Sequence, residues 1–104
     1  MATELLGKKI ISKRTVVETT AILIPSTGVA PGTSAAETGR QSVDFFNEGS
    51  LTAWIGDSDV TTGEAGNGYP LAPGASKAFD AADGCTFYAR TASGTTTIKS
   101  LEGV

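Results

Sequence analysis

The chain alternates short apolar runs with breaks rich in Gly, Pro and Ser, and after Arg14 no stretch has a helical period. Residues 15–24 (TVVETTAILI) are rich in β-branched side chains, and Pro25 ends this run. Residues 21–24 are apolar on both faces, as in a strand that is covered on both sides. The pattern therefore predicts a buried strand near the N-terminus.

The alternation becomes regular in the second half of the chain. Residues 41–47 place Val43 and Phe45 on one face of a strand and Phe46 on the other. Residues 47–50 (NEGS) have turn chemistry, so we expect a hairpin into the next strand. Further strands are expected at residues 51–55, 76–80, 86–90 and 95–101, with an extended piece at 69–74. Short strands with regular turn signals predict an all-β protein, a single small antiparallel β-sandwich or barrel.

Three aromatic residues point to the face of their strand that is opposite to the face with the other apolar residues. These residues are Phe46, Trp54 and Tyr88. A single buried sheet face would leave all three in water, so we infer that part of the outer surface is covered by the N-terminal arm, by a long loop or by another subunit. The alternative is a β-bulge that shifts the register and exchanges the two faces.

Charge and composition divide the chain into a basic N-terminal arm (residues 1–14) and a β-sandwich body (residues 15–104). Four of the eight basic residues but only one of the eleven acids fall in the arm, which also carries two apolar pairs. The arm residues concerned are Leu5, Leu6, Lys8, Lys9, Ile10, Ile11, Lys13 and Arg14. Such an arm could dock onto a neighbouring copy or another acidic surface, or it could be a solvated terminus. Residues 26–39 are small, Gly- and Pro-rich, and predict a long surface loop.

Length and composition limit the classes of function. The 104 residues suffice for one domain, and homo-oligomerisation would relieve the small core. No apolar run is long enough to span a membrane, and the first residues do not form a secretory signal, so we expect synthesis in a cytoplasm. The basic residues lack interleaved aromatics, so we expect no direct nucleic-acid binding. The single cysteine, Cys85, is expected to be a small buried hydrophobe.

Catalytic chemistry has few candidates, and we expect no enzyme, cofactor or metal site. The chain has no histidine, which excludes a Ser-His-Asp triad and the commonest general base. Asp57 and Asp59 begin the spacing of a calcium loop, but Thr61 stands where a third oxygen ligand is expected, and Glu64 is too near. Residues 63–68 are rich in glycine but lead into Tyr-Pro rather than a helix, so a phosphate loop is not predicted.

A succession of short motifs covers about two-thirds of the chain, from residue 39 to residue 101. The motifs are Gly39-Arg40-Gln41-Ser42-Val43, Asn47, Trp54-Ile55-Gly56, Val60-Thr61, Pro70-Leu71-Ala72-Pro73-Gly74, Asp83-Gly84, Tyr88-Ala89 and Thr91-Ala92-Ser93-Gly94-Thr95. In this order and spacing they resemble the small accessory virion proteins of tailed phages and prophages. Four of the glycines, Gly39, Gly56, Gly74 and Gly94, also have a physical reason, since each stands where a strand must turn sharply.

The resemblance implies a structural virion protein assembled in the host cytoplasm, most of all a capsid decoration or cement protein that binds the major capsid protein. The alternatives are a neck, tail or fibre subunit and, from another class, a glycan- or receptor-binding module with Trp54, Tyr69 or Tyr88 as stacking platforms. The expected partners are other virion proteins and further copies of the chain. The expected partner interface comprises Leu5, Leu6, Lys8, Lys9, Ile10, Ile11, Lys13, Arg14, Phe46, Trp54 and Tyr88.

Overall fold

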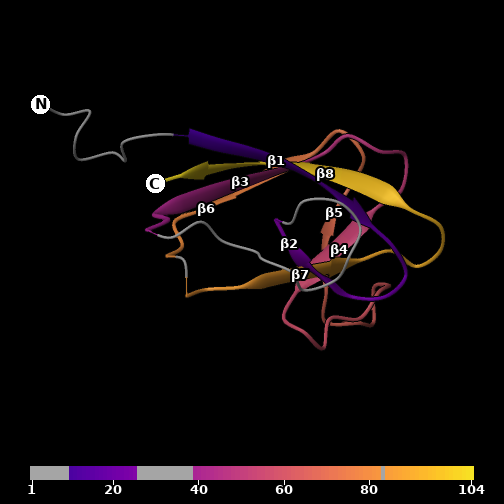
Figure 1. The fold of residues 1–104 in the computed structure, drawn as a ribbon. Coiled ribbons are helices and arrows are strands. Elements are labelled where there is room, and N and C mark those ends of the chain that lie inside the picture. The colour runs from indigo at the N-terminus through magenta and orange to yellow at the C-terminus, as the bar shows by residue number, and fades with distance from the viewer. Residues whose placement is uncertain (1–9, 26–38, 83) are drawn as a thin grey trace, which may run out of the picture.

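The computed structural model describes residues 10–25, 39–82 and 84–104, and within these ranges it contains strands and no helix (Figure 1). The strands are β1 (Ile10–Val17), β2 (Ile22–Ile24), β3 (Ser42–Asn47), β4 (Ala53–Gly56), β5 (Tyr69–Leu71), β6 (Ser76–Phe79), β7 (Phe87–Arg90) and β8 (Thr96–Gly103). The predicted all-β class is confirmed. The predicted strands of the second half are all present, with ends that differ by one or two residues.

The strands form two four-stranded antiparallel sheets that pack face to face. Sheet A has the order β1-β8-β3-β6, and sheet B has the order β2-β7-β4-β5. Of the two architectures predicted, the fold is therefore the sandwich. This strand order is that of the eight-stranded jelly roll, in which nearly every connection crosses from one sheet to the other.

The crossing connections correct the prediction of a hairpin at residues 47–50. β3 lies in sheet A between β8 and β6, whereas β4 lies in sheet B between β7 and β5, so these consecutive strands do not pair. The turn residues are where they were expected, but they form a corner between the sheets. Turn chemistry specifies a local change of direction and leaves the partner of each strand to long-range packing.

Asn47 explains how this corner is held. Its side chain is fully buried, and its Nδ2 donates to the carbonyl oxygens of Leu51 and Leu71, each at 2.8 Å. Its Oδ1 accepts from the Gly49 amide at 3.0 Å and from the Thr96 hydroxyl at 2.8 Å. Both donors and the carbonyl oxygen of the amide are therefore satisfied, as burial of such a group requires. One side chain thus connects the corner to β5 and to β8.

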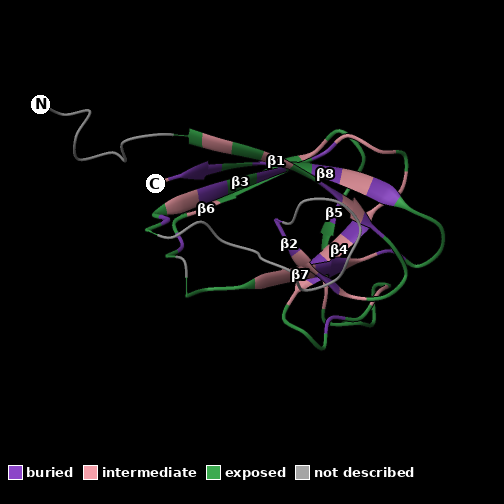
Figure 2. Ribbon diagram, viewed as in Figure 1, coloured by how far each residue is buried: buried purple, intermediate pink, exposed green. Residues whose placement is uncertain are grey.

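The core lies between the sheets and follows the predicted alternation. Val43 and Phe45 point inward from β3, and Ile55 points inward from β4. The rings of Phe45, Phe79 and Phe87 form a cluster with centroid distances of 4.8–6.1 Å, a normal range for aromatic pairs. The degree of burial alternates along β1 and β8, as the bands of colour in Figure 2 show.

The first strand begins within the range that we assigned to the arm. Residues 10–14 form the first part of β1, which pairs with β8 along its whole length. The single strand predicted at residues 15–24 is divided into β1 and β2, which belong to different sheets. Residues 1–9 of the arm and most of the predicted loop at 26–39 lie outside the described residues.

Candidate functional site

The outer face of sheet A combines apolar and charged side chains at the surface. The register places Leu101 beside Asp44 and Lys99 beside Phe46, and Arg14 lies beside Lys99 on the other side. These five side chains line one surface depression. Phe46 is 39% exposed and Leu101 is 48% exposed, so an apolar patch is left in contact with solvent. Exposed apolar area on a regular sheet is typical of a surface that binds another protein.

The charges on this face are partly paired within the chain. Glu48 lies between two basic residues, with Arg14 Nε in contact with one carboxylate oxygen and Lys99 Nζ 3.6 Å from the other. The hydrogen bond from Arg14, aided by the positive charge of Lys99, lowers the pKa of Glu48 below its ordinary value. Among the described residues no basic side chain forms an ion pair with Asp44.

Three of the residues predicted for the partner interface come together on this face. Ile10 is 62% exposed at the start of β1, and Arg14 and Phe46 lie in one row across the sheet. Lys13 has the opposite orientation, because alternate residues of β1 point inward, and its side chain is 9% exposed. Ile11 points to the same inner side of β1 as Lys13 and is only partly exposed. Leu5, Leu6, Lys8 and Lys9 lie outside the described residues.

Two predicted interface residues belong instead to sheet B. Trp54 on β4 and Tyr88 on β7 lie on its outer face, and both are only partly exposed. The parity predicted for all three aromatics is therefore observed, and no bulge exchanges the faces at these strands. Sequence reasoning did not identify Leu101 or Lys99 as surface contacts, although Leu101 also lies on the parity opposite to the buried Ile98.

Residues 57–68 cover part of the outer face of sheet B. They lie on the side of β4 and β7 away from sheet A (Figure 1). Val60 is 2% exposed, and a Cβ added to Gly56 would lie 3.0 Å from its side chain. A Cβ at Gly68 would lie 2.9 Å from the Cβ of Trp54, so this loop also packs closely beside Trp54. Part of the cover of sheet B thus comes from the loop in which calcium and phosphate patterns were considered.

The same loop contains the acidic residues considered for calcium. Asp57 Oδ1 accepts the Asp59 amide at 2.9 Å, which is an ordinary Asx turn. Thr61 and Asn67 exchange hydrogen bonds across the loop, with Asn67 Oδ1 2.8 Å from the Thr61 amide. Within the described residues, no three His, Cys, Asp or Glu side chains gather where they could hold a metal ion. The part of the chain that the structure describes also has no helix long and apolar enough to cross a membrane.

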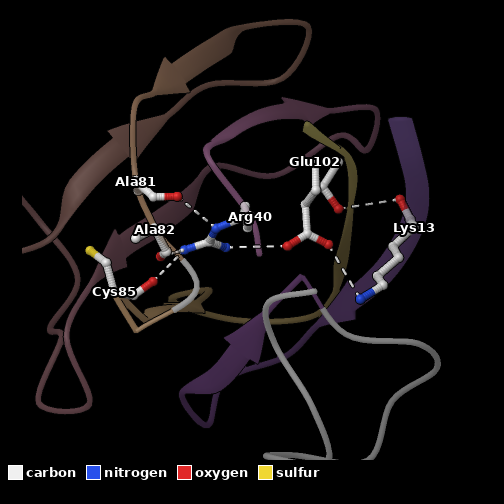
Figure 3. A network of polar contacts seen from close by, with 7 residues as sticks. Lys13, Arg40, Ala81, Ala82, Cys85 and Glu102 are labelled. Atoms are coloured by element: carbon white, nitrogen blue, oxygen red, sulfur yellow. Dashed lines mark hydrogen bonds and ion pairs between the residues drawn. The ribbon is translucent and has the colours of Figure 1, made fainter. Parts of the chain in front are cut away.

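A buried ionic network lies at the end of the sandwich where β1, β3 and β8 meet (Figure 3). Glu102 is fully buried, with Arg40 Nη1 3.3 Å from Oε2 and Lys13 Nζ 3.3 Å from Oε1. Arg40 Nε donates to the carbonyl of Ala81 at 2.9 Å, and Nη2 donates to the carbonyls of Ala82 and Cys85. The guanidinium carbon also lies 5.6 Å from the centre of the Phe87 ring. Burial of this arginine is therefore offset by a carboxylate, three carbonyls and an aromatic ring.

The position of Arg40 gives the network a structural role. Its acceptors lie in the connection from β6 to β7, which passes from sheet A to sheet B. Arg40 lies just before β3, so its hydrogen bonds hold this connection against the end of the sandwich at which β3 begins. The sequence indicated Arg40 only through the resemblance, and nothing in the local pattern indicates that its partner Glu102 lies 62 residues away.

The same connection corrects the expectation for Cys85. The thiol is exposed, because β7 begins at Phe87 and Cys85 precedes it in the crossing segment. The sequence places an apolar run here, but the geometry of the crossing turns this side chain outward. Cys85 is therefore not the small buried hydrophobe that we predicted.

A crevice at the open edge of the sandwich is the second concave feature. Tyr69, Lys77, Phe79 and Phe87 contribute to its lining. Tyr69 is 51% exposed, and Lys77 Nζ lies 5.9 Å from the centre of its ring, within reach of a cation–π contact. Of the three aromatics suggested as stacking platforms, Tyr69 is the most exposed, whereas Trp54 and Tyr88 are partly covered.

Comparison of the chain with protein-family models, with curated proteins and with solved structures gives no significant match.

Proposed function

We propose that this chain is a structural protein of a bacteriophage virion, and that it acts as a decoration or cement protein on the capsid. The observation that carries the proposal is the outer face of sheet A, where exposed Phe46 and Leu101 lie among charged side chains. Such a surface gains free energy when a second protein removes it from water. Many copies bound to a shell would stabilise it through many contacts that are individually weak.

Two further observations support the proposal. The jelly roll is a fold found in viral capsid domains. This analogy supports the proposal, but a fold alone does not identify a function. Three of the motifs that resemble accessory virion proteins contain a glycine at a turn of this fold, and these residues, Gly39, Gly74 and Gly94, have φ values of +80°, +81° and +69°. These backbone conformations favour glycine, which gives the motifs a physical reason. Gly56 has no positive φ but approaches Val60 closely.

The experiment is to locate the protein in particles purified from cells in which its gene is expressed with the rest of a phage genome. An antibody against the chain should label heads, and quantitative mass spectrometry should give a copy number comparable to that of the major capsid protein. A Phe46→Glu variant should be depleted from the particles, whereas Tyr69→Glu, an equally drastic change on another surface, should be retained. Purified particles that lack the protein would overturn the proposal.

Two other functions would give different outcomes in the same experiment. A neck, tail or fibre subunit would be present in a small fixed number per particle and at one position. A glycan- or receptor-binding module is favoured by exposed Tyr69 at the crevice beside Lys77, since jelly rolls also occur in lectins. Tyr69→Ala would then abolish adsorption to host polysaccharide and leave the particle intact.

A further inference from the structure

We propose that the outer face of sheet A is a two-fold interface between two copies of this chain. This dimer would be the homo-oligomer expected for the proposed function, and its role in the particle rests on that function. The dimer itself is a property of the purified protein and can be tested without a virion.

The first step is the arrangement of four side chains at the centre of the face. Leu101 on β8 lies beside Asp44 on β3, and Lys99 on β8 lies beside Phe46 on β3. Because residues two apart point to the same side of a sheet, the four side chains occupy the corners of a rectangle of about 5 by 7 Å. The two apolar residues lie on one diagonal, and the two opposite charges lie on the other.

This arrangement is self-complementary. A two-fold axis parallel to the apolar diagonal places Phe46 against Phe46 of the second copy and Leu101 against Leu101 of the second copy. After the same rotation, Lys99 lies about 3 Å to the side of the position directly above Asp44 of the second copy. A flexible lysine side chain easily spans this offset. Each charge pair is formed twice, as an isologous interface requires. The strands of the copies would cross at about 70°, near the orthogonal mode of sheet packing.

The balance of charge favours a copy of the same chain over a strongly charged partner. Arg14 and Lys99 are balanced on this face by Glu48 and Asp44, although the whole chain has a net charge of −3. A highly acidic or basic surface would meet as much repulsion as attraction here. A copy rotated by two-fold symmetry instead meets each sign with the opposite one.

Three of the four edge strands of the two sheets are less suited to assembly than this face. The long edge strand β1 carries an inward-pointing charge, Lys13, which is engaged by Glu102 inside the sandwich. In sheet B, the edge strand β5 contains Pro70, which cannot donate a backbone hydrogen bond. The other edge strand of sheet B, β2, has only three residues. Inward charges, proline and short edge strands are devices that oppose strand addition. Association through a sheet face is therefore favoured.

The available area indicates a weak and reversible dimer. β1 and β8 have eight residues each, or about 26 Å, and four strands span about 19 Å, so the face measures roughly 500 Å². Two such faces, which overlap only in part when the strands cross, bury at most about 1,000 Å², the lower limit for a specific protein–protein interface. We therefore expect a monomer–dimer equilibrium that is visible only at raised protein concentration.

The first measurement is sedimentation velocity or light scattering on the full chain over a concentration series. The mass should rise from 10.5 kDa towards twice this value as the concentration increases. Phe46→Glu should weaken dimerisation at least tenfold, since it places two like charges in contact across the axis. Tyr69→Glu is the matched control, because Tyr69 is more exposed than Phe46 but lies on sheet B, and it should dimerise like the wild type.

The second measurement tests the predicted pairing of residue 99 with residue 44 of the other copy. Asp44→Lys and Lys99→Asp should each be monomeric, because each places like charges opposite one another twice. An equimolar mixture of the two variants should form heterodimers, because every charge of one variant then meets its opposite on the other. Circular dichroism spectra like that of the wild type would confirm that both variants are folded.

The outcomes separate this dimer from the proposed function. A wild-type protein that stays monomeric to about 1 mM, a Phe46→Glu variant that dimerises normally, or a mixture that stays monomeric would each overturn the dimer. Presence of the chain in particles would still support the virion function in those cases. Conversely, heterodimers in the mixture would support the interface even if the protein were absent from particles.

Discussion

Replacing Glu102 by Gln removes one negative charge from the centre of the buried network and leaves the shape of the side chain unchanged. Glu102 is fully buried, and the two cations that face it, Arg40 and Lys13, have side chains that are 0% and 9% exposed. Neither cation can regain full hydration while the sandwich remains closed. The variant therefore leaves two positive charges close together without the carboxylate that offsets them.

The magnitude follows from this burial. Removing one partner of a buried ion pair costs about 3–5 kcal/mol, and a domain of this size has about 5–15 kcal/mol of stability in total. We therefore expect Glu102→Gln to lower the midpoint of thermal unfolding by more than about 12 °C. Chemical unfolding in urea, followed by Trp54 fluorescence, gives the free energy directly, provided that the slope of the transition is unchanged.

The chain contains a matched control. Glu48 also lies between one arginine and one lysine, but Arg14 and Lys99 are 66% and 58% exposed. Glu48→Gln removes the same charge from a solvated cluster, where water replaces the lost contacts, and the midpoint should stay close to that of the wild type. If the two variants were destabilised equally, burial of the network would not be what makes it important. If Glu102→Gln were as stable as the wild type, the assignment of Arg40 and Lys13 as charged buried partners would be refuted.

Three further outcomes are expected from the same coordinates. Asn47→Asp loses the two donors that bond the carbonyls of Leu51 and Leu71, so it should cost about 2–5 kcal/mol in urea unfolding, whereas Asn67→Asp in the exposed loop should cost much less. The pKa of Glu48 is lowered by Arg14, so its stabilising contribution is present above its ordinary value of 4.5 and is lost as the pH falls through the lower folded value. The small difference between the unfolding midpoints of the wild type and of Glu48→Gln should therefore disappear on acidification, and a difference that stays constant with pH would exclude this linkage. The exposed Cys85 thiol should react with a thiol reagent without denaturant. Its rate of reaction should agree with that in the unfolded chain to within about tenfold. Complete protection would instead show that the crossing segment covers the thiol.

Local pattern was sufficient to predict the elements in the second half of this fold, from β3 to β8. Apolar and polar residues alternate with the period of a strand, so Phe45 was assigned inward and Phe46 outward, as the structure has them. Turn residues marked where each strand ends. Both signals act over a few neighbouring residues, and both can therefore be seen in the sequence alone.

The pairing of the strands was decided only by the tertiary structure. β3 and β4 are joined by a short turn, yet they belong to different sheets, and the two partners of β3 are β6 and β8. Burial of the core contributes the free energy that holds these partners together, and in its aromatic cluster Phe45 is distant in the sequence from Phe79 and Phe87. The periodicity of one strand carries no information about which other strand covers it.

The same limit applies to the two features with the most consequence for function. Lys13 and Arg14 are adjacent basic residues in the sequence, but strand geometry turns one into the buried network and the other onto the exposed face of sheet A. The sequence by itself determined the class of fold and, in the second half of the chain, the facing of the strands and the positions of the turns, because these depend on local sterics and hydrophobic period. Only the packing of the two sheets decided which charges are buried and which side chains form one surface, because those depend on contacts between distant segments.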